Sequence, residues 1–79
     1  MSLYNIAVIG TGYIGHEHIK AIAAHPKAQL HTICSTPRSQ AIAQEWMTTF
    51  GANQITTTYQ DVIDNESIDI IYLCTPNSQ

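Results

Sequence analysis

The sequence predicts an α/β fold built on a parallel β-sheet, and three observations support this class. Apolar, β-branched segments alternate along the chain with segments of helical spacing. The first and last of these segments, residues 4–9 and 68–74, are apolar apart from Asn5 and Asp69, which is typical of strands buried on both faces of a parallel sheet. Gly10, Pro26 and Gly51 separate the segments. Strands and helices that alternate in this way predict parallel strands joined by helical crossovers.

The first half of the chain is predicted to hold two strands and the helix between them. The first strand covers residues 4–9 and runs directly into Gly10. The helix that follows has apolar residues that share one face: Ile14, Ile19, Ile22 and Ala23. Pro26 ends this helix, and residues 30–34 form the second strand.

The second half is predicted to open with a helix from Thr36 to Gly51. Thr36 suits the N-cap and Pro37 the first helical position, while Gly51 supplies a left-handed C-cap. The apolar residues expected on its inner face, as core packing, are Ile42, Ala43, Trp46, Met47 and Phe50. The remaining elements are a weak strand over 54–57, a short helix with Val62 and Ile63, and the strongest strand over 68–74. Thr58 and Asp61 have the spacing of a capping box for the short helix.

Right-handed crossovers fix how these elements are arranged. Two successive crossovers in one direction place the first two helices on one face, and the return crossover places the third helix on the other. The predicted strand order is therefore 3-2-1-4, the first half of a doubly wound sheet. We expect residues 1–79 to be the N-terminal portion of a larger domain, with the last strand left as an open edge.

Composition and charge exclude several classes of function. The formal charge is −3, and the cations Lys20, Lys27 and Arg38 are scattered, so no basic face for nucleic acid exists. No stretch has the length of a membrane span and no leader pattern opens the chain, so we expect a cytoplasmic protein. Cys34 and Cys74 are the last residues of predicted strands that lie on either side of a third, about 10 Å apart. That separation is too long for a disulfide, and we interpret both as buried free thiols.

The strongest functional signal is the glycine pattern of residues 10–15, which reads Gly10-Thr11-Gly12-Tyr13-Ile14-Gly15. It follows a strand and opens a helix, the context in which G-x-G-x-x-G binds the pyrophosphate of a dinucleotide. The first glycine permits a tight turn, the second a close approach of the backbone, and the third close helix packing. Backbone N–H groups and the helix dipole hold the anion without a lysine. A glycine-rich turn without a ligand is the alternative, whereas a Walker loop is excluded because no Gly-Lys-Ser/Thr follows.

The end of the second strand indicates which dinucleotide is preferred. NAD-selective sites usually carry Asp or Glu about twenty residues beyond the glycines, where this chain has Ser35. Without that carboxylate a 2′-phosphate is not repelled. The hydroxyls of Ser35 and Thr36 can donate to it, and Arg38 can pair with it. We therefore favour NADP(H) over NAD(H); the alternatives are that Thr36 only caps its helix and that Arg38 is only solvated.

The histidines predict no metal site and no catalytic residue. His16 and His18 are two residues apart, so they point to different sides of their helix and cannot share a metal. His25 and His31, at a helix end and on a strand, show no partner set either.

Three segments resemble the glucose–fructose oxidoreductase and inositol dehydrogenase family (Gfo/Idh/MocA). They are G-T-G-Y-I-G-H-E-H at 10–18, I-C-S-T-P-R at 33–38 and D-I-I-Y-L-C-T-P-N at 69–77. His18, three places after the last glycine, and the final Thr-Pro-Asn are the more specific features. The resemblance implies an N-terminal Rossmann domain followed by a C-terminal α/β domain, so that this chain would be a fragment of a two-domain protein.

The resemblance also implies an activity and a set of binding residues. Members oxidise or reduce a sugar, a polyol or a related hydroxyl or carbonyl compound with NAD(P). Residues 10–15 would hold the pyrophosphate, Ser35, Thr36 and Arg38 would face the adenosine ribose, and Cys74, Thr75, Pro76 and Asn77 would line the nicotinamide side. The family's catalytic lysine, in a Glu-Lys-Pro motif, comes after Asn77, so no residue here is expected to act as general acid or base.

For the full-length protein we expect a dinucleotide cofactor, a small-molecule substrate and a homo-oligomeric assembly, with neither nucleic acid nor a membrane as partner. Two alternatives remain from the residues alone. One is a non-catalytic Rossmann module that senses dinucleotides. The other is a class with a different ligand, such as S-adenosylmethionine, which shares the glycine turn.

Overall fold

The computed structural model describes residues 3–10 and 13–74, with the backbone alone at residues 13 and 14. Its elements are, in order, β1 (Tyr4–Ile9), α1 (Tyr13–Ala24), β2 (Ala28–Cys34), the 3-10 helix η1 (Pro37–Ser39), α2 (Gln40–Phe50), β3 (Gln54–Thr56), α3 (Tyr59–Ile63) and β4 (Ile70–Leu73). In this described part, no helix is both long enough and apolar enough to cross a membrane.

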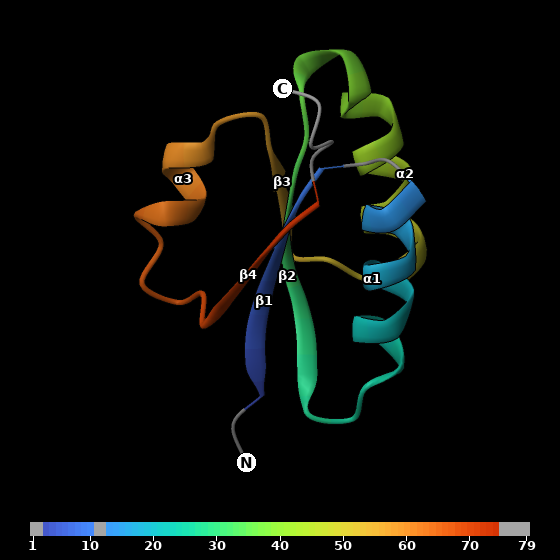
Figure 1. Cartoon of the computed structure of the whole chain (residues 1–79), viewed down its shortest axis with the longest axis vertical. Helices are drawn as coiled ribbons and strands as arrows, with labels where there is room; N and C mark the ends of the chain where they lie inside the picture. Colours follow the sequence, from blue (N-terminus) through green and yellow to red (C-terminus); the bar gives the residue numbers. More distant parts are fainter. Residues whose placement is uncertain (1–2, 11–12, 75–79) are drawn as a thin grey trace.

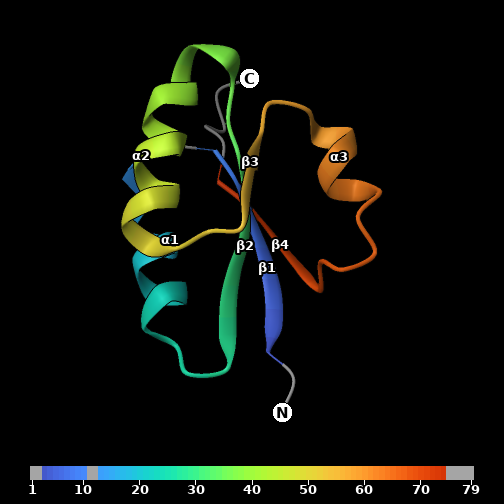
Figure 2. The ribbon, with the colours of Figure 1, turned by 180° about the vertical axis from the view of Figure 1, so that it is seen from behind.

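The strands form a four-stranded sheet in the order β3-β2-β1-β4. All neighbouring pairs are parallel, with Ile9 in register with Cys34 on one side and Leu73 on the other. Helices α1 and α2 lie on one face of the sheet and α3 on the other (Figure 1), as the view from behind also shows (Figure 2). The predicted fold class, strand order and placement of the helices are confirmed.

Strand β1 belongs to two separate cores, one on each face of the sheet. Its side chains alternate between the two faces because a strand has a period of two. The core beneath α1 and α2 comprises Ile6, Val8, Ile19, Ile22, Leu30, Ile33 and Ala43. The core beneath α3 comprises Ala7, Ile9, Cys34 and Val62. The apolar residues Ile6 to Ile9 of β1 therefore reflect burial on both faces, as predicted.

Strand β4 differs from β1 although its sequence is equally apolar. All of its residues, Ile70 to Leu73, are exposed, and Leu73 retains 66% of its accessible surface. No helix in the described residues covers β4 on the α3 side, where α3 is short (Figure 1). The prediction of an open, apolar edge strand matches this exposure.

The inner faces of the two longer helices differ in detail from the prediction. On α1, Ile19 and Ile22 are buried but Ala23 is exposed. On α2, the fully buried residue is the small Ala43, whereas Ile42 is 43% exposed. Periodicity identified the right face of each helix but not its centre, because α2 packs through a small residue that brings its backbone close to the core.

The helix predicted from Thr36 to Gly51 begins with the short segment η1. Thr36 is the predicted cap, and its Oγ1 accepts a hydrogen bond from the N–H of Ser39 at 3.3 Å. Gly51 ends α2 in the left-handed conformation with φ of 81°, and its N–H donates to the carbonyl of Met47. Both ends of the predicted helix are confirmed.

The capping box predicted at Thr58 and Asp61 is wrong. The Thr58 side chain makes no capping hydrogen bond to α3. Instead the Thr56 hydroxyl donates to the Asp61 carboxylate at 2.8 Å and accepts from the N–H of Thr58 at 3.1 Å. The hydroxyl of Thr56, the last residue of β3, therefore stabilises the turn into α3, because it bonds both Thr58 and Asp61.

The predicted strand over 68–74 is shorter in the structure, because its first residues form a polar junction with β1. The N–H of Asn5 donates to the Asp69 carboxylate and the N–H of Asp69 to the carbonyl of Asn5, both at 2.8 Å. The Asn5 side-chain amide donates to the carbonyl of Ser67 at 2.9 Å. This exchange fixes the amino end of β4 beside β1. The strand bounds at Leu30 and Thr57 shift as well, to Ala28 and Thr56.

Candidate dinucleotide-binding site

The carboxyl ends of β1 and β4 form the point at which the direction of strand order reverses. From β1 the chain proceeds outward to β2 and β3, and then returns to place β4 on the other side of β1. The N–H of Cys74, just after β4, donates to the carbonyl of Ile9 at 2.8 Å, so the two strands stay paired to their ends. Ligands of open α/β sheets bind outside the carboxyl ends of strands at such a point.

The turn from β1 into α1 has the geometry that requires glycine. Gly10 adopts φ of 113°, a conformation that side chains rarely tolerate. Its N–H donates to the carbonyl of Cys34 at 2.9 Å, which fixes the start of the turn to the end of β2. A Cβ on Gly15 would lie 2.5 Å from the Gly10 carbonyl oxygen. The first turn of α1 therefore packs directly against the backbone that leaves β1, and no larger residue fits at position 15.

The amino end of α1 is electrostatically suited to an anion. The helix begins at Tyr13 and has no acidic residue in its first turn, so nothing opposes the positive end of its dipole. Its unpaired N–H groups are the groups that bind phosphates at other helix N-termini. Thr11 and Gly12 lie outside the described residues, as do the side chains of Tyr13 and Ile14.

The end of β2 carries the residues expected to face the adenosine ribose. Ser35 is only 6% exposed, and its N–H donates to the carbonyl of Thr56 at 2.9 Å. Its Oγ is buried and has no hydrogen-bond partner among the described residues. The Thr36 hydroxyl accepts the capping bond at η1 and keeps its own proton free to donate. Arg38 lies in η1 and is exposed.

The structure places a charged residue, Asp61, near the end of β2, whereas the sequence indicated it only as a capping residue. Asp61, on α3, lies close enough to β2 to help raise the pKa of the Cys34 thiol, although burial is the larger cause. Its carboxylate is already bonded to the Thr56 hydroxyl. Asp61 lies much further along the chain than the acid that usually follows the glycines by about twenty residues, because it belongs to the crossover from β3 to β4.

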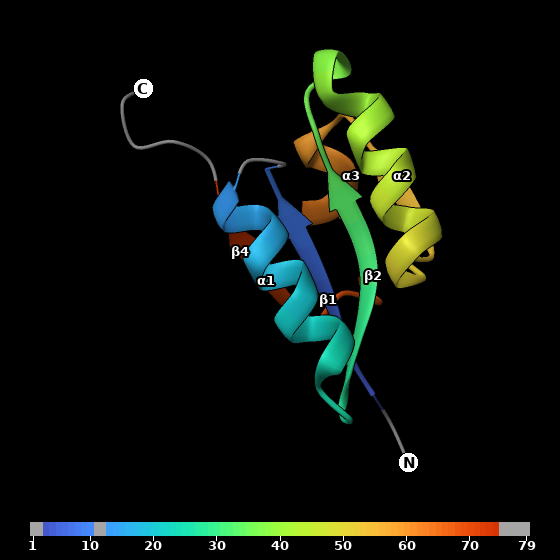
Figure 3. The same ribbon diagram turned by 90° about the vertical axis from the view of Figure 1, so that its right-hand side faces the viewer.

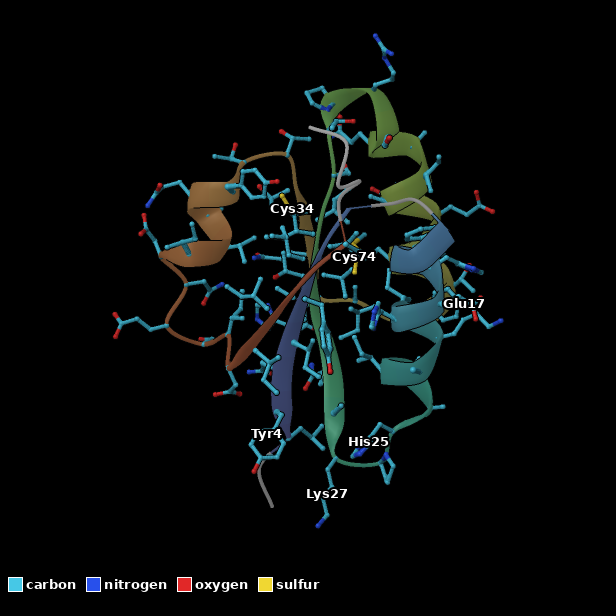
Figure 4. The ribbon with its side chains drawn as sticks, in the orientation of Figure 1. Tyr4, Glu17, His25, Lys27, Cys34 and Cys74 are labelled. Carbon is cyan, nitrogen blue, oxygen red and sulfur yellow. The ribbon has the colours of Figure 1, made fainter. Side chains whose placement is uncertain are left out.

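The two cysteines lie on opposite faces of the sheet. Cys34 belongs to the core beneath α3, and Cys74 packs against the core beneath α1 and α2. Figure 4 shows both near the carboxyl edge, Cys34 on the α3 side. Both are free thiols, as expected, but only Cys34 is buried and Cys74 is half-buried; burial raises the pKa of each. Residues 75–77, predicted to line the nicotinamide side, lie outside the described residues.

Two histidines of α1 make aromatic contacts in different directions. His16 contacts Trp46 and Phe50 of α2, with ring centroids 5.1 and 5.9 Å apart. His18 stacks on Tyr72 of β4, with centroids 4.8 Å apart and ring planes inclined by 22°. No pattern in the sequence indicates Tyr72 as the partner of His18. Over the described residues, no three His, Cys, Asp or Glu side chains gather as a potential metal site.

Curated proteins of similar sequence are reductases and oxidoreductases. The N-acetyl-gamma-glutamyl-phosphate reductase of Ehrlichia canis is 29% identical over 76 residues, which cover 92% of this chain and 22% of that protein. An uncharacterised oxidoreductase of Bacillus subtilis, YrbE, is 28% identical over 71 residues, covering 90% of this chain and 20% of its own length. The chain thus spans about a fifth of the curated relatives that it matches.

Solved structures of similar fold include dehydrogenases with bound cofactor. Levoglucosan dehydrogenase in complex with NADH and L-sorbose has a TM-score of 0.81 at 28% identity, covering 98% of this chain and 22% of that one. GenD2 from gentamicin A biosynthesis, in complex with NAD, has a TM-score of 0.84 at 25% identity, covering 96% and 21%. Myo-inositol 2-dehydrogenase from Lactobacillus plantarum has a TM-score of 0.81 at 26% identity, covering 95% and 22%.

A family model also matches nearly the whole chain. It covers residues 4–79, and the model is that of an oxidoreductase family with an NAD-binding Rossmann fold. The turn at Gly10 and Gly15 and the strand order described above are those of a Rossmann domain. The chain therefore belongs to the Gfo/Idh/MocA oxidoreductase family and carries its NAD-binding Rossmann fold.

Proposed function

We propose that this chain is the dinucleotide-binding part of an NAD(P)-dependent oxidoreductase that acts on a sugar, a polyol or a related hydroxyl or carbonyl compound. The observation that supports this best is the turn at the carboxyl end of β1. There Gly10 has a positive φ and a Cβ on Gly15 would meet its carbonyl oxygen, the tight turn from strand into helix that the pyrophosphate of a dinucleotide requires. The substrate class is supported by the names of the similar dehydrogenases, which act on levoglucosan and myo-inositol.

The proposed domain organisation is an N-terminal portion of the Rossmann domain at residues 1–79, with the rest of that domain and a C-terminal α/β domain following. Two observations support it. The chain spans only 22% of the similar dehydrogenases, and the apolar strand β4 is exposed along its length. In this organisation the groups that transfer protons to and from the substrate belong to the following part. This chain then contributes cofactor binding and orientation, while the bound nicotinamide supplies hydride transfer.

We propose that residues 10–15 bind the pyrophosphate and residues 74–77 line the nicotinamide side. Cys74 is the described member of the second group, and it lies at the strand end next to Gly15, where a Cβ would be 3.7 Å from its own. The two groups therefore meet at the junction of β1, β4 and α1.

We further propose that NADP(H) binds more tightly than NAD(H). The buried Ser35 hydroxyl has no hydrogen-bond partner among the described residues, and Arg38 is exposed on η1, three residues further along the chain. Both can bind a 2′-phosphate, Arg38 through a charge-assisted contact. The negative charge of Asp61 disfavours a 2′-phosphate, but its carboxylate already accepts a hydrogen bond from the Thr56 hydroxyl.

Calorimetric titration of the full-length protein with NADPH and NADH tests both proposals. We expect both to bind and NADPH to bind more tightly. Arg38→Ala should weaken NADPH binding on the order of tenfold and leave NADH unchanged, because only the former has the phosphate. Gly12→Val should abolish binding of both while circular dichroism stays unchanged, because a side chain there would occupy the space of the pyrophosphate.

Each part of the proposal has its own contrary result. Full affinity in Gly12→Val would contradict the pyrophosphate site. Equal or tighter NADH binding would contradict the NADP(H) preference but leave the dinucleotide site intact. Failure to oxidise any sugar or polyol, with tight cofactor binding, would contradict the substrate class alone.

A further inference from the structure

We propose that His18 is a positioning residue for the nicotinamide half of the cofactor and acts through its stacking contact with Tyr72. This inference rests on the proposed function, since it concerns how the dinucleotide is held. It assigns a role to the histidine that follows the glycine loop, which the loop itself does not explain.

The contact joins α1 to the edge strand of the sheet. The rings of His18 and Tyr72 are nearly parallel, inclined by 22°, with centroids 4.8 Å apart. Such near-parallel pairs are among the favoured arrangements of aromatic side chains. His18 is half-buried, and Tyr72 remains 37% exposed, so the pair lies along the open seam between α1 and β4. Figure 3 shows α1 in front of β4 and β1.

A second contact lies on the same seam, nearer the site. Gly15 is one helical turn before His18, and a Cβ there would lie 3.7 Å from that of Cys74. Cys74 directly follows β4 and, two residues beyond Tyr72, points to the same side of the sheet. Helix and strand run in opposite directions, so Gly15 meets Cys74 at the carboxyl edge and His18 meets Tyr72 one step below. These two points fix the position of α1 along β4.

This seam sets the relation between the two halves of the cofactor site. In the proposed function the amino end of α1 faces the pyrophosphate, and Cys74, directly after β4, lines the nicotinamide side. A shift of α1 along β4 would move the pyrophosphate relative to the nicotinamide wall. Misplacements of about 1 Å are costly for a reaction that depends on the orientation of a transferred group.

His16 offers a matched comparison on the same turn of α1. It contacts Trp46 and Phe50, so it fastens the helix to α2 rather than to β4. Removing the His16 imidazole deletes the contacts of α1 with α2, and removing the His18 imidazole deletes its contact with Tyr72. Only removal of His18 weakens the contact between α1 and β4, on which the spacing of the two halves of the cofactor site depends.

The test uses the full-length protein and two probes, NADH and ADP-ribose, which differ in the nicotinamide. In His18→Ala we expect the affinity for NADH to fall about three- to tenfold, while that for ADP-ribose changes less than about twofold. The fluorescence of bound NADH should shift toward that of the free cofactor. His18→Phe, which keeps an aromatic ring, should restore both readouts, and His16→Ala should lower the melting temperature without changing the ratio of the two affinities.

The partner residue provides a second route should His18→Ala fail to fold. Tyr72→Leu should reproduce the selective loss for NADH, and Tyr72→Phe should not. Equal losses for NADH and ADP-ribose, or no loss for either, would overturn the positioning role. A wild-type protein that binds neither probe would instead overturn the proposed function, so the two failures are distinguishable.

Discussion

Gly15 and Gly51 illustrate two different reasons for glycine. At Gly15 the backbone conformation is ordinary, but a Cβ would meet the Gly10 carbonyl oxygen at 2.5 Å. At Gly51 there is open space, but φ is 81°. The first glycine is required by packing and the second by conformation, and only the first lies at the nucleotide turn.

This contrast gives a prediction at the residue scale. Gly15→Ala should lower the free energy of unfolding by about 1–3 kcal/mol, because backbone atoms must move apart, and should weaken dinucleotide binding as well. Gly51→Ala should cost a similar amount, about 1–2 kcal/mol, through its left-handed conformation, with unchanged affinity. Denaturant unfolding and calorimetric titration of the full-length variants separate the two effects. Unchanged binding in Gly15→Ala would show that the close packing is not needed for the ligand.

The Cys34 thiol predicts an alkaline loss of stability. Burial, and secondly Asp61, raises its pKa in the folded chain. The folded state therefore holds the proton more tightly, so this stability is complete below the pKa of the unfolded thiol, about 8.5. It is lost as the pH rises through the folded pKa. The decline in unfolding free energy above that pH should be shallower in Cys34→Ala, and slightly shallower in Asp61→Asn; identical slopes would contradict the assignment.

At the scale of elements, α3 is held by a single buried side chain. Val62 is 1% exposed, whereas its neighbour Ile63 is 62% exposed. Val62→Ala should destabilise the protein by about 1–3 kcal/mol, because it empties the core beneath α3. Ile63→Ala should change the stability of the 79-residue chain by no more than about 0.5 kcal/mol. Thermal unfolding of both variants measures this difference, and equal effects would show that the helix is not anchored through Val62.

The elements also show how far the sequence predicts the fold. Strand β1, the face and ends of α2 and the strand order followed from periodicity, from Gly51 and from the handedness of crossovers. The turn around Thr56 and the polar junction at Asn5 and Asp69 did not, since both depend on residues that are distant in the sequence or that compete for the same partner. The same limit applies to the candidate site, where Tyr72 and Asp61 come from later elements.

At the scale of the whole molecule, the exposed strand β4 governs the behaviour of the chain by itself. Ile71 and Leu73 present apolar surface beside an unpaired strand edge, which favours association. We expect the 79-residue chain to associate in sedimentation experiments and to bind a hydrophobic dye. Leu73→Lys should reduce both, whereas Leu3→Lys, at an exposed residue before β1, should not. A monomeric wild-type chain that binds no dye would contradict this expectation.

The anchoring of Gly10 has a consequence for the thermodynamics of ligand capture. Its N–H is tied to the end of β2, and it continues the most deeply buried strand of the sheet. The start of the turn is thus ordered when the chain folds rather than when a ligand arrives, and little backbone entropy is left to lose there on association. Because this part of the site is already ordered, less of the favourable interaction energy is lost to ordering when the ligand binds.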